Sequence, residues 1–171
     1  MISVVFTRSK LPGSKLIRWL YGGLSSHMAI VLDDRLVFHS NFSGTQLKWL
    51  SSFMKKNEFV FQSDLYWLIP EEEELIYQRL IKYDEKKYDF KAGLYLLFAG
   101  LFNRILGTKI PKSNPWSDKR AYLCIELIEV LSVIGLSIGH LDIMFPDHVY
   151  YQLRDLITER IKSGNIPSFR A

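Results

Sequence analysis

The order of secondary-structure signals along this chain constrains its fold more than any other feature of the sequence. Runs of β-prone residues come first, and helical runs follow. Residues 2–7 are rich in β-branched and aromatic side chains, which is typical of a strand. Two further β-prone runs, 26–32 and 36–40, flank the acidic turn 33–35 and so predict a hairpin. Residues 58–69 supply one or two more strands. Strands followed by helices predict an α+β fold.

Helix-start signals mark the second half of the chain. Pro70, followed by four glutamates, begins a helix that we expect to end near Asp84. Residues 90–106 are apolar nearly all round, which predicts a buried or interface helix. Two further helices are expected, a short one over residues 15–21 and an amphipathic one over residues 147–161. We expect one domain over residues 1–171, with a poorly ordered tail over 163–171.

Composition and charge narrow the classes of function. The net charge of +4 is spread along the chain without a basic stripe that carries stacking aromatics, which argues against nucleic-acid binding. No apolar run reaches the roughly 18 residues of a membrane span, although peripheral contact with a membrane stays open. The N-terminus lacks the charge-then-apolar order of a signal peptide, so we expect a cytoplasmic or virion-associated protein.

The single cysteine, Cys124, lies where an apolar helix is expected to begin. The loop-like tract 112–120 precedes it, and apolar residues recur after it at largely helical spacing. A thiol in the first turn of a helix faces unpaired N–H groups and the positive end of the dipole, which favour the nucleophilic thiolate. A small buried hydrophobe is an equally good interpretation of the position alone.

A catalytic thiol needs a base and a group that orients the base, and two histidines offer both. His27 and His39 lie on opposite arms of the predicted hairpin. A two-residue turn would pair Met28 with His39 and place His27 on the other face of the sheet. We therefore predict a loop with an odd number of residues, centred on Asp33 or Asp34, that brings the two imidazoles to one face.

Three short motifs follow one another along the chain: Ser26-His27-Met28-Ala29-Ile30-Val31-Leu32, then Lys87-Tyr88-Asp89, then Tyr122-Leu123-Cys124-Ile125-Glu126-Leu127-Ile128. In this order they resemble the circularly permuted papain-fold hydrolases. These are the YiiX- and YebB-like relatives of the NlpC cell-wall peptidases, and they include the lecithin retinol acyltransferase group. The resemblance covers residues 2–153, including Phe145-Pro146-Asp147 at the start of the last helix. It implies a permuted papain-like (NlpC-type) fold whose antiparallel sheet packs against the cysteine-bearing helix.

The resemblance also implies a role for each matching residue. Cys124 would be the nucleophile, His27 the base and His39 the polar residue that orients His27. Tyr88 matches a tyrosine that helps bind the oxyanion together with the backbone N–H of Cys124. A buried ring with a satisfied hydroxyl is the alternative for Tyr88.

Two positions near these motifs depart from the pattern of the family, and a third has a structural interpretation. Ile125 stands where many relatives have serine, and Lys86 where a glycine is usual. Glu126 is interpreted as a helix-start carboxylate rather than a catalytic group.

These features predict a cysteine hydrolase, an amidase or peptidase that forms an acyl-enzyme on Cys124. A peptidoglycan peptide is one expected substrate class. The chain also resembles phage-encoded members of this family, which implies a role in the virion or in lysis. Hydrolysis or transfer of a lipid acyl group is the alternative, with the apolar run 93–102 bordering the site. A catalytically silent binding or virion-structural protein with the same fold also stays open.

No cofactor or metal ion is expected. Four residues near the last helix have chemically suitable ligand types but lack an established spacing: His140, Asp142, Asp147 and His148.

Overall fold

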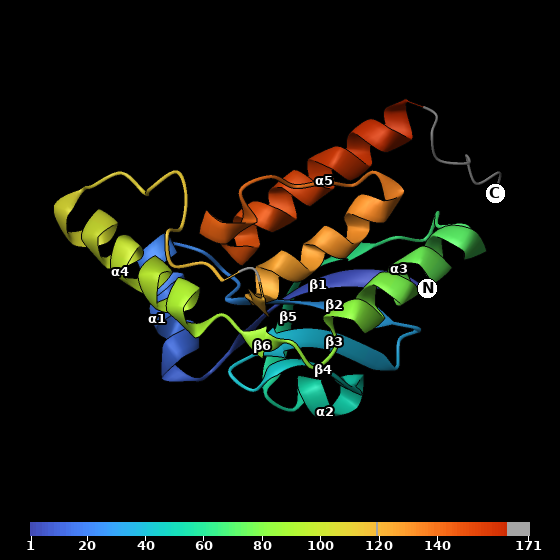
Figure 1. Cartoon of the computed structure of the whole chain (residues 1–171), viewed down its shortest axis with the longest axis horizontal. Helices are drawn as coiled ribbons and strands as arrows, with labels where there is room; N and C mark the ends of the chain where they lie inside the picture. The colour runs from blue at the N-terminus through green and yellow to red at the C-terminus, as the bar shows by residue number, and fades with distance from the viewer. Residues whose placement is uncertain (119, 164–171) are drawn as a thin grey trace.

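The computed structural model describes residues 1–118 and 120–163, and a five-stranded antiparallel sheet lies at its centre (Figure 1). The strands run in the spatial order β4-β3-β2-β1-β5, so each strand pairs with an antiparallel neighbour. Their bounds are β1 (Ile2–Ser9), β2 (His27–Leu32), β3 (Leu36–Asn41), β4 (Gly44–Trp49) and β5 (Asn57–Asp64). The predicted α+β class is confirmed.

The α-helices are α1 (Pro12–Tyr21), α2 (Leu50–Met54), α3 (Pro70–Tyr83), α4 (Phe90–Leu106) and α5 (Pro146–Lys162). The longer helices α3, α4 and α5 follow the sheet along the chain, as the sequence predicted, whereas α1 and α2 lie between its strands. Two 3₁₀ segments, η1 (Cys124–Ile134) and η2 (Leu141–Ile143), and a short parallel pair, β6 (Lys87–Tyr88) and β7 (Ala121–Tyr122), complete the fold. A poorly ordered tail was predicted over residues 163–171. Ser163 caps the C-terminus of α5, and residues 164–171 lie outside the described part of the chain.

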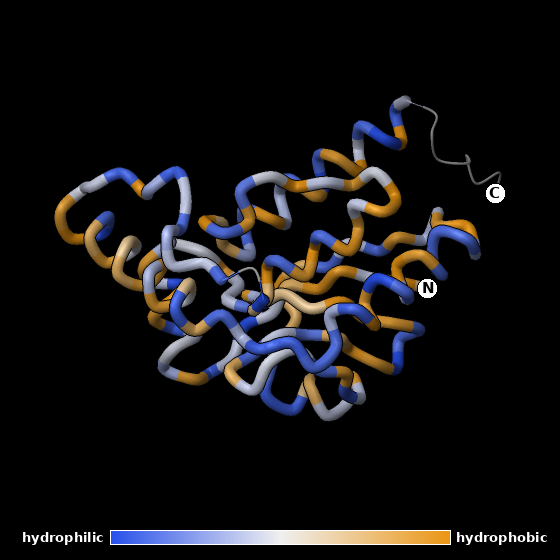
Figure 2. Tube along the Cα trace, viewed as in Figure 1, coloured by the Kyte–Doolittle hydropathy of each residue, from blue (hydrophilic) through white to orange (hydrophobic). Residues whose placement is uncertain are grey.

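The two faces of the sheet bury different clusters, because side chains alternate along each strand. Met28 and Ile30 of β2 belong to the main core, which η1, α3 and α5 close from one side. Ala29 and Val31 face the other way, into a smaller cluster with Phe53 of α2. Figure 1 shows α5 on one side of the sheet and α2 on the other, and Figure 2 shows the apolar strands between these layers.

The β2–β3 hairpin has the predicted odd connection. Leu32 pairs with Leu36 and Ala29 with His39, so the loop contains three residues, Asp33, Asp34 and Arg35. Both aspartates adopt positive φ angles, 50° and 54°, a conformation that Asp tolerates better than most residues. His27 is two residues from Ala29, and it therefore shares a face of the sheet with His39.

The helix expected to begin at Cys124 is present, and it is a 3₁₀ helix. Its pattern repeats every three residues, which matches three residues per turn. One row along η1 is aliphatic and buried: Ile125, Ile128, Leu131 and Ile134. A second row begins with Cys124 and continues through Leu127, Val130 and Val133. The third row holds the polar residues Glu126, Glu129 and Ser132.

Helix α4, expected to be a buried or an interface helix, is only partly buried. Its buried residues are confined to one stripe: Ala92, Leu96 and Gly100. This stripe faces α1, where the Tyr21 hydroxyl donates a hydrogen bond to the Leu96 carbonyl and lies against Gly100. The opposite side of α4 presents large apolar side chains to solvent.

Three strands were not predicted. Strand β4 lies at the edge of the sheet, and the other two form the β6–β7 pair. Helix α1 also begins at Pro12, earlier than expected, so Ser14 lies inside it. The Ser14 hydroxyl accepts a hydrogen bond from the Ser9 N–H at 3.0 Å, which ties the end of β1 to α1.

Candidate active site

Cys124 is the first residue of η1, and its backbone setting is well fixed. Leu123 precedes η1 in an extended conformation, and its N–H donates a 2.6 Å hydrogen bond to Oε2 of Glu126. Glu126 therefore satisfies a backbone donor at the start of the helix, as its predicted structural role requires. The Cys124 side chain is half-buried and packs against the main core.

The electrostatics of the thiol differ from the expectation. Burial raises the pKa of Cys124 to about 11, and the negative charge of Glu126 adds to this effect. Backbone N–H groups of Met28 and Ile125 act in the opposite direction, but they do not outweigh the desolvation. The thiol is thus protonated near pH 7, whereas the helix-start argument predicted a lowered pKa.

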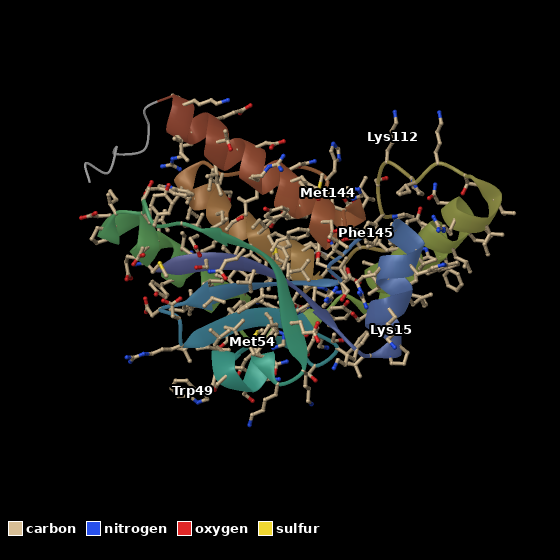
Figure 3. The ribbon with its side chains drawn as sticks, turned by 180° about the vertical axis from the view of Figure 1, so that it is seen from behind. Lys15, Trp49, Met54, Lys112, Met144 and Phe145 are labelled. Atoms are coloured by element: carbon tan, nitrogen blue, oxygen red, sulfur yellow. The ribbon has the colours of Figure 1, made fainter. Side chains whose placement is uncertain are left out.

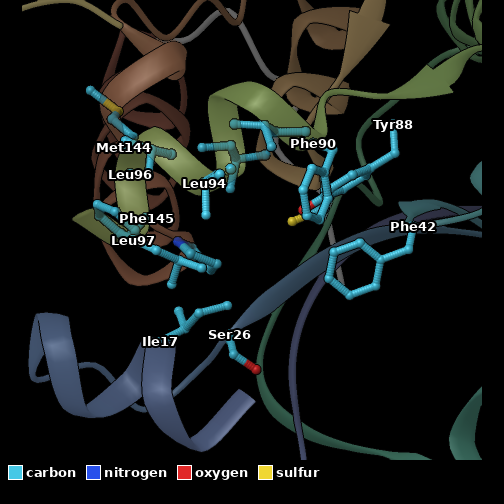
Figure 4. A pocket seen from close by; sticks show the side chains of 15 residues that line it. Ile17, Ser26, Phe42, Tyr88, Phe90, Leu94, Leu96, Leu97, Met144 and Phe145 are labelled. Atoms are coloured by element: carbon cyan, nitrogen blue, oxygen red, sulfur yellow. The ribbon is translucent and has the colours of Figure 1, made fainter. Parts of the chain in front are cut away.

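Cys124 lines a largely apolar cavity of about 140 Å³ between η1, α4, α1 and the start of α5. Ser26 and Tyr88 supply the other side-chain polar groups of its wall. Figure 4 shows Phe42 and Phe90 beside Tyr88, with Ile17 and Phe145 across the opening. The remaining lining residues are Gly93, Leu94, Leu96, Leu97, Leu123, Ile125, Met144 and Pro146. Such a wall suits an apolar group better than a charged one.

Tyr88 is brought to the same pocket as Cys124, as the resemblance implied. Its ring makes an edge-to-face contact with Phe42 at 5.2 Å between centroids. Burial raises the pKa of its hydroxyl, and the charge that Cys124 carries as a thiolate raises it further. The Tyr88 hydroxyl is therefore a neutral hydrogen-bond donor, and no hydrogen bond occupies it within residues 1–118 and 120–163.

The two predicted histidines also meet. Nε2 of His27 lies 3.3 Å from Nδ1 of His39, and both rings pack against Phe53, at 5.9 and 5.1 Å between centroids. Burial is the main cause that lowers the pKa of His27 to about 3 and of His39 to about 4. Both imidazoles are neutral at pH 7, so one ring donates an N–H to the lone pair of the other.

The structure forms these two pairs but does not join them. His27 and His39 face α2, whereas Cys124 packs with Met28 on the other side of the sheet. In the part of the chain that the structure describes, no hydrogen bond connects the Cys124 thiol to either imidazole. The cysteine pocket and the histidine pair are connected through the backbone at the start of β2. Ser26 lines the pocket, and His27 is the next residue.

Two carboxylates support the site in ways that were not predicted. Asp147, in the first turn of α5, accepts hydrogen bonds from the N–H of Leu24 at 2.6 Å and of Ser25 at 2.9 Å. It thereby holds the segment that leads into Ser26 and His27. Asp89 is buried, and it caps α4 through the Ala92 N–H at 2.8 Å. The Pro-Asp and Tyr-Asp motifs were the available sequence signals for these roles.

The four residues considered as metal ligands have other roles or lie apart. Asp142 accepts a hydrogen bond from the Asn114 N–H at 2.8 Å, and Asp147 holds the segment before β2. His140 and His148 are exposed. Among residues 1–118 and 120–163, no group of three or more His, Cys, Asp or Glu side chains could hold a metal ion.

No family model, no curated protein and no solved structure matches the chain. Within the described residues, none of the helices has the length and apolar character needed to cross a membrane.

Proposed function

We propose that this chain is a cysteine hydrolase of the permuted papain type that acts on an apolar acyl group. The observation that carries the proposal is the position of Cys124, at the start of η1 and in the wall of an apolar cavity beside the Tyr88 hydroxyl. The chain order supports it, because the histidine strands precede the cysteine segment and the sheet packs against that segment.

In the proposed reaction, the Cys124 sulfur attacks the acyl carbonyl carbon while His27 accepts the thiol proton. The Tyr88 hydroxyl and the Cys124 backbone N–H donate to the oxyanion. His27 returns the proton to the leaving group, and water releases the acyl group from sulfur. Before substrate binds, His39 holds the His27 ring through the 3.3 Å contact between Nε2 of His27 and Nδ1 of His39.

The separation of His27 from the thiol sets a requirement for this reaction. Catalytic hydrogen bonds are often long or misaligned without substrate and tighten in the complex. The His27 ring must turn away from Phe53 and approach the pocket past the end of β2, where Ser26 already lines the wall. The reaction therefore includes an approach of His27 that accompanies substrate binding.

The lining of the cavity favours a lipid-like acyl chain over a cell-wall peptide. Peptidoglycan stem peptides are rich in charged and polar groups, and the cavity wall has few polar side chains that could bind such groups. A fatty acyl chain would instead replace water along the leucine and phenylalanine side chains of the wall. Peptide cleavage stays the alternative substrate class.

A second function, binding of an apolar ligand without catalysis, is favoured by one specific observation. The thiol has a raised pKa of about 11, and among the described residues no imidazole forms a hydrogen bond with it. A chain that only binds would keep Cys124 as a protonated part of the wall.

The deciding experiment is incubation with nitrophenyl esters of increasing acyl length, followed by mass spectrometry of the intact protein. The hydrolase predicts an acyl adduct on Cys124 that is lost in Cys124→Ser and in His27→Ala. His148→Ala is the matched control, because His148 is exposed on α5 and outside the pocket. Ester binding without an adduct, combined with a thiol that alkylates only toward pH 11, would instead establish the binding function.

A further inference from the structure

Helix α4 carries a second apolar stripe that faces solvent. Phe98, Leu101, Phe102, Ile105 and Leu106 are 36% to 65% exposed. Their spacing of three, four, seven and eight residues is that of one helix face. At about 100° per residue, this face lies opposite the buried residues Ala92, Leu96 and Gly100. An apolar helix face normally lies against a core, so this one needs a partner outside the described chain.

Helix α1 extends the apolar surface. Leu16 and Trp19 are exposed on α1, and the Arg104 guanidinium lies over the Trp19 ring at 5.6 Å. Figure 1 shows α1 and α4 together at one end of the sheet, and Figure 2 shows how much of α4 is hydrophobic. We call residues 8–24 and 90–117 the α1/α4 lobe.

The net positive charge, which the sequence alone indicated to be spread along the chain, lies in this lobe. It contains eight of the 22 Lys and Arg residues and none of the 18 Asp and Glu residues. Its formal charge is therefore +8, whereas the rest of the chain carries −4. Figure 3 shows Lys15 on α1 and Lys112 after α4 at the same end of the molecule. Asp89 precedes the second segment of the lobe but is buried in the cap of α4.

We propose that the α1/α4 lobe docks on the surface of an anionic lipid bilayer. Exposed Phe, Leu, Ile and Trp side chains beside Lys and Arg are the composition of helices that lie in a bilayer interface. A second copy of the chain is a poorer partner, because it would bring two lobes of +8 together. The bilayer supplies both the apolar phase and the opposite charge.

The docked lobe would place the Cys124 cavity at the lipid surface. Ile17 of α1 and Phe90, Leu94 and Leu97 of α4 line that cavity, so its wall is continuous with the lobe. Docking itself does not involve the thiol and does not depend on the proposed hydrolase function.

Flotation with lipid vesicles tests the proposal. The full chain should float with vesicles of equal parts phosphatidylglycerol and phosphatidylcholine, and bind pure phosphatidylcholine at least ~10-fold more weakly. Phe102→Ser/Ile105→Ser should weaken binding at least ~10-fold, because both side chains enter the interface. Leu75→Ser/Ile81→Ser on α3 is the matched control, since these residues are also exposed but lie outside the lobe.

Charge and catalysis are tested separately. Lys15→Glu/Lys112→Glu should weaken binding to anionic vesicles at least ~10-fold and reduce its dependence on salt. Cys124→Ser should bind as the unchanged protein does, which separates docking from the hydrolase function. Circular dichroism should show each variant folded.

Two outcomes would overturn the proposal. One is equal binding of the lobe variants and the α3 control. In the other, the protein does not float with vesicles but forms a dimer in solution, and Phe102→Ser/Ile105→Ser converts that dimer to a monomer. A second copy of the chain would then cover the stripe.

Discussion

Replacement of Asp147 by alanine should loosen the segment that positions His27. The Asp147 carboxylate accepts hydrogen bonds from the N–H groups of Leu24 and Ser25, and from the Ser25 hydroxyl. Leu24 is exposed, so water can accept the hydrogen bond of its N–H in place of the carboxylate. Ser25 is buried, so its N–H and hydroxyl would be left without an acceptor. A hydrogen bond to a charged group contributes about 1.5–3 kcal/mol. We therefore expect Asp147→Ala to lower the free energy of unfolding by about 3 kcal/mol, a large share of the 5–15 kcal/mol typical of a domain.

Urea denaturation at pH 7 measures this loss, and hydrogen exchange at the Ser25 amide locates it. The amide should exchange much faster in Asp147→Ala than in the unchanged protein, while the buried amides of β2 should follow only the global change. Asp147→Asn keeps one carbonyl oxygen and should cost about half as much. Asp155→Ala, an exposed carboxylate on the same helix that pairs with its neighbour, should cost less than about 0.5 kcal/mol. A loss below about 1 kcal/mol in Asp147→Ala, with Ser25 exchange unchanged, would refute the reasoning.

Three further changes test other contacts. Gly100→Ala should lower the melting temperature, at a cost of about 1–3 kcal/mol, because its methyl group meets Tyr21, whereas Gly13→Ala has open space and should be neutral. The pKa of His39 is lowered in the folded protein, so this imidazole binds a proton in the unfolded chain first. His39 should therefore lower the stability by up to about 3 kcal/mol as the pH drops from about 6.5 toward 4, and His27 adds to this fall. His39→Gln should flatten that slope in acid-denaturation curves. Asn114→Ala should cost about 2 kcal/mol and speed proteolysis between residues 107 and 118, because its side chain bonds both Ala92 and Asp142.

The parts of the fold that could be predicted are those with strong local signals. Pro70 and Pro146 fixed two helix starts, because proline suits the first turn, and the acidic turn after Leu32 marked the hairpin. Strand β4 was missed because it lies at the edge of the sheet and leaves Leu47 and Trp49 exposed. An edge strand of this kind buries little, so it lacks a clear pattern of apolar residues.

The site was predictable in its parts but not in its assembly. The parity of the loop put His27 and His39 on one face, because successive residues of a strand alternate. Which face Cys124 packs against depends on tertiary packing, and no local pattern carries that information. The direction of the Cys124 pKa was wrong for a related reason: the dipole of a helix start acts within one turn, whereas burial depends on the whole fold.

The exact three-residue repeat of η1 has a consequence for how this segment can change. Three residues complete one turn, so the insertion or deletion of a single residue rotates everything after it by about 120°. A single deletion just after Ile125 would move the glutamate and serine row into the places of the buried aliphatic row. It would also move Leu127, Val130 and Val133 into the places of the polar row. Only changes of three residues at a time preserve the rows. The angular position of Cys124 relative to the rows that follow it is thus fixed by counting in threes.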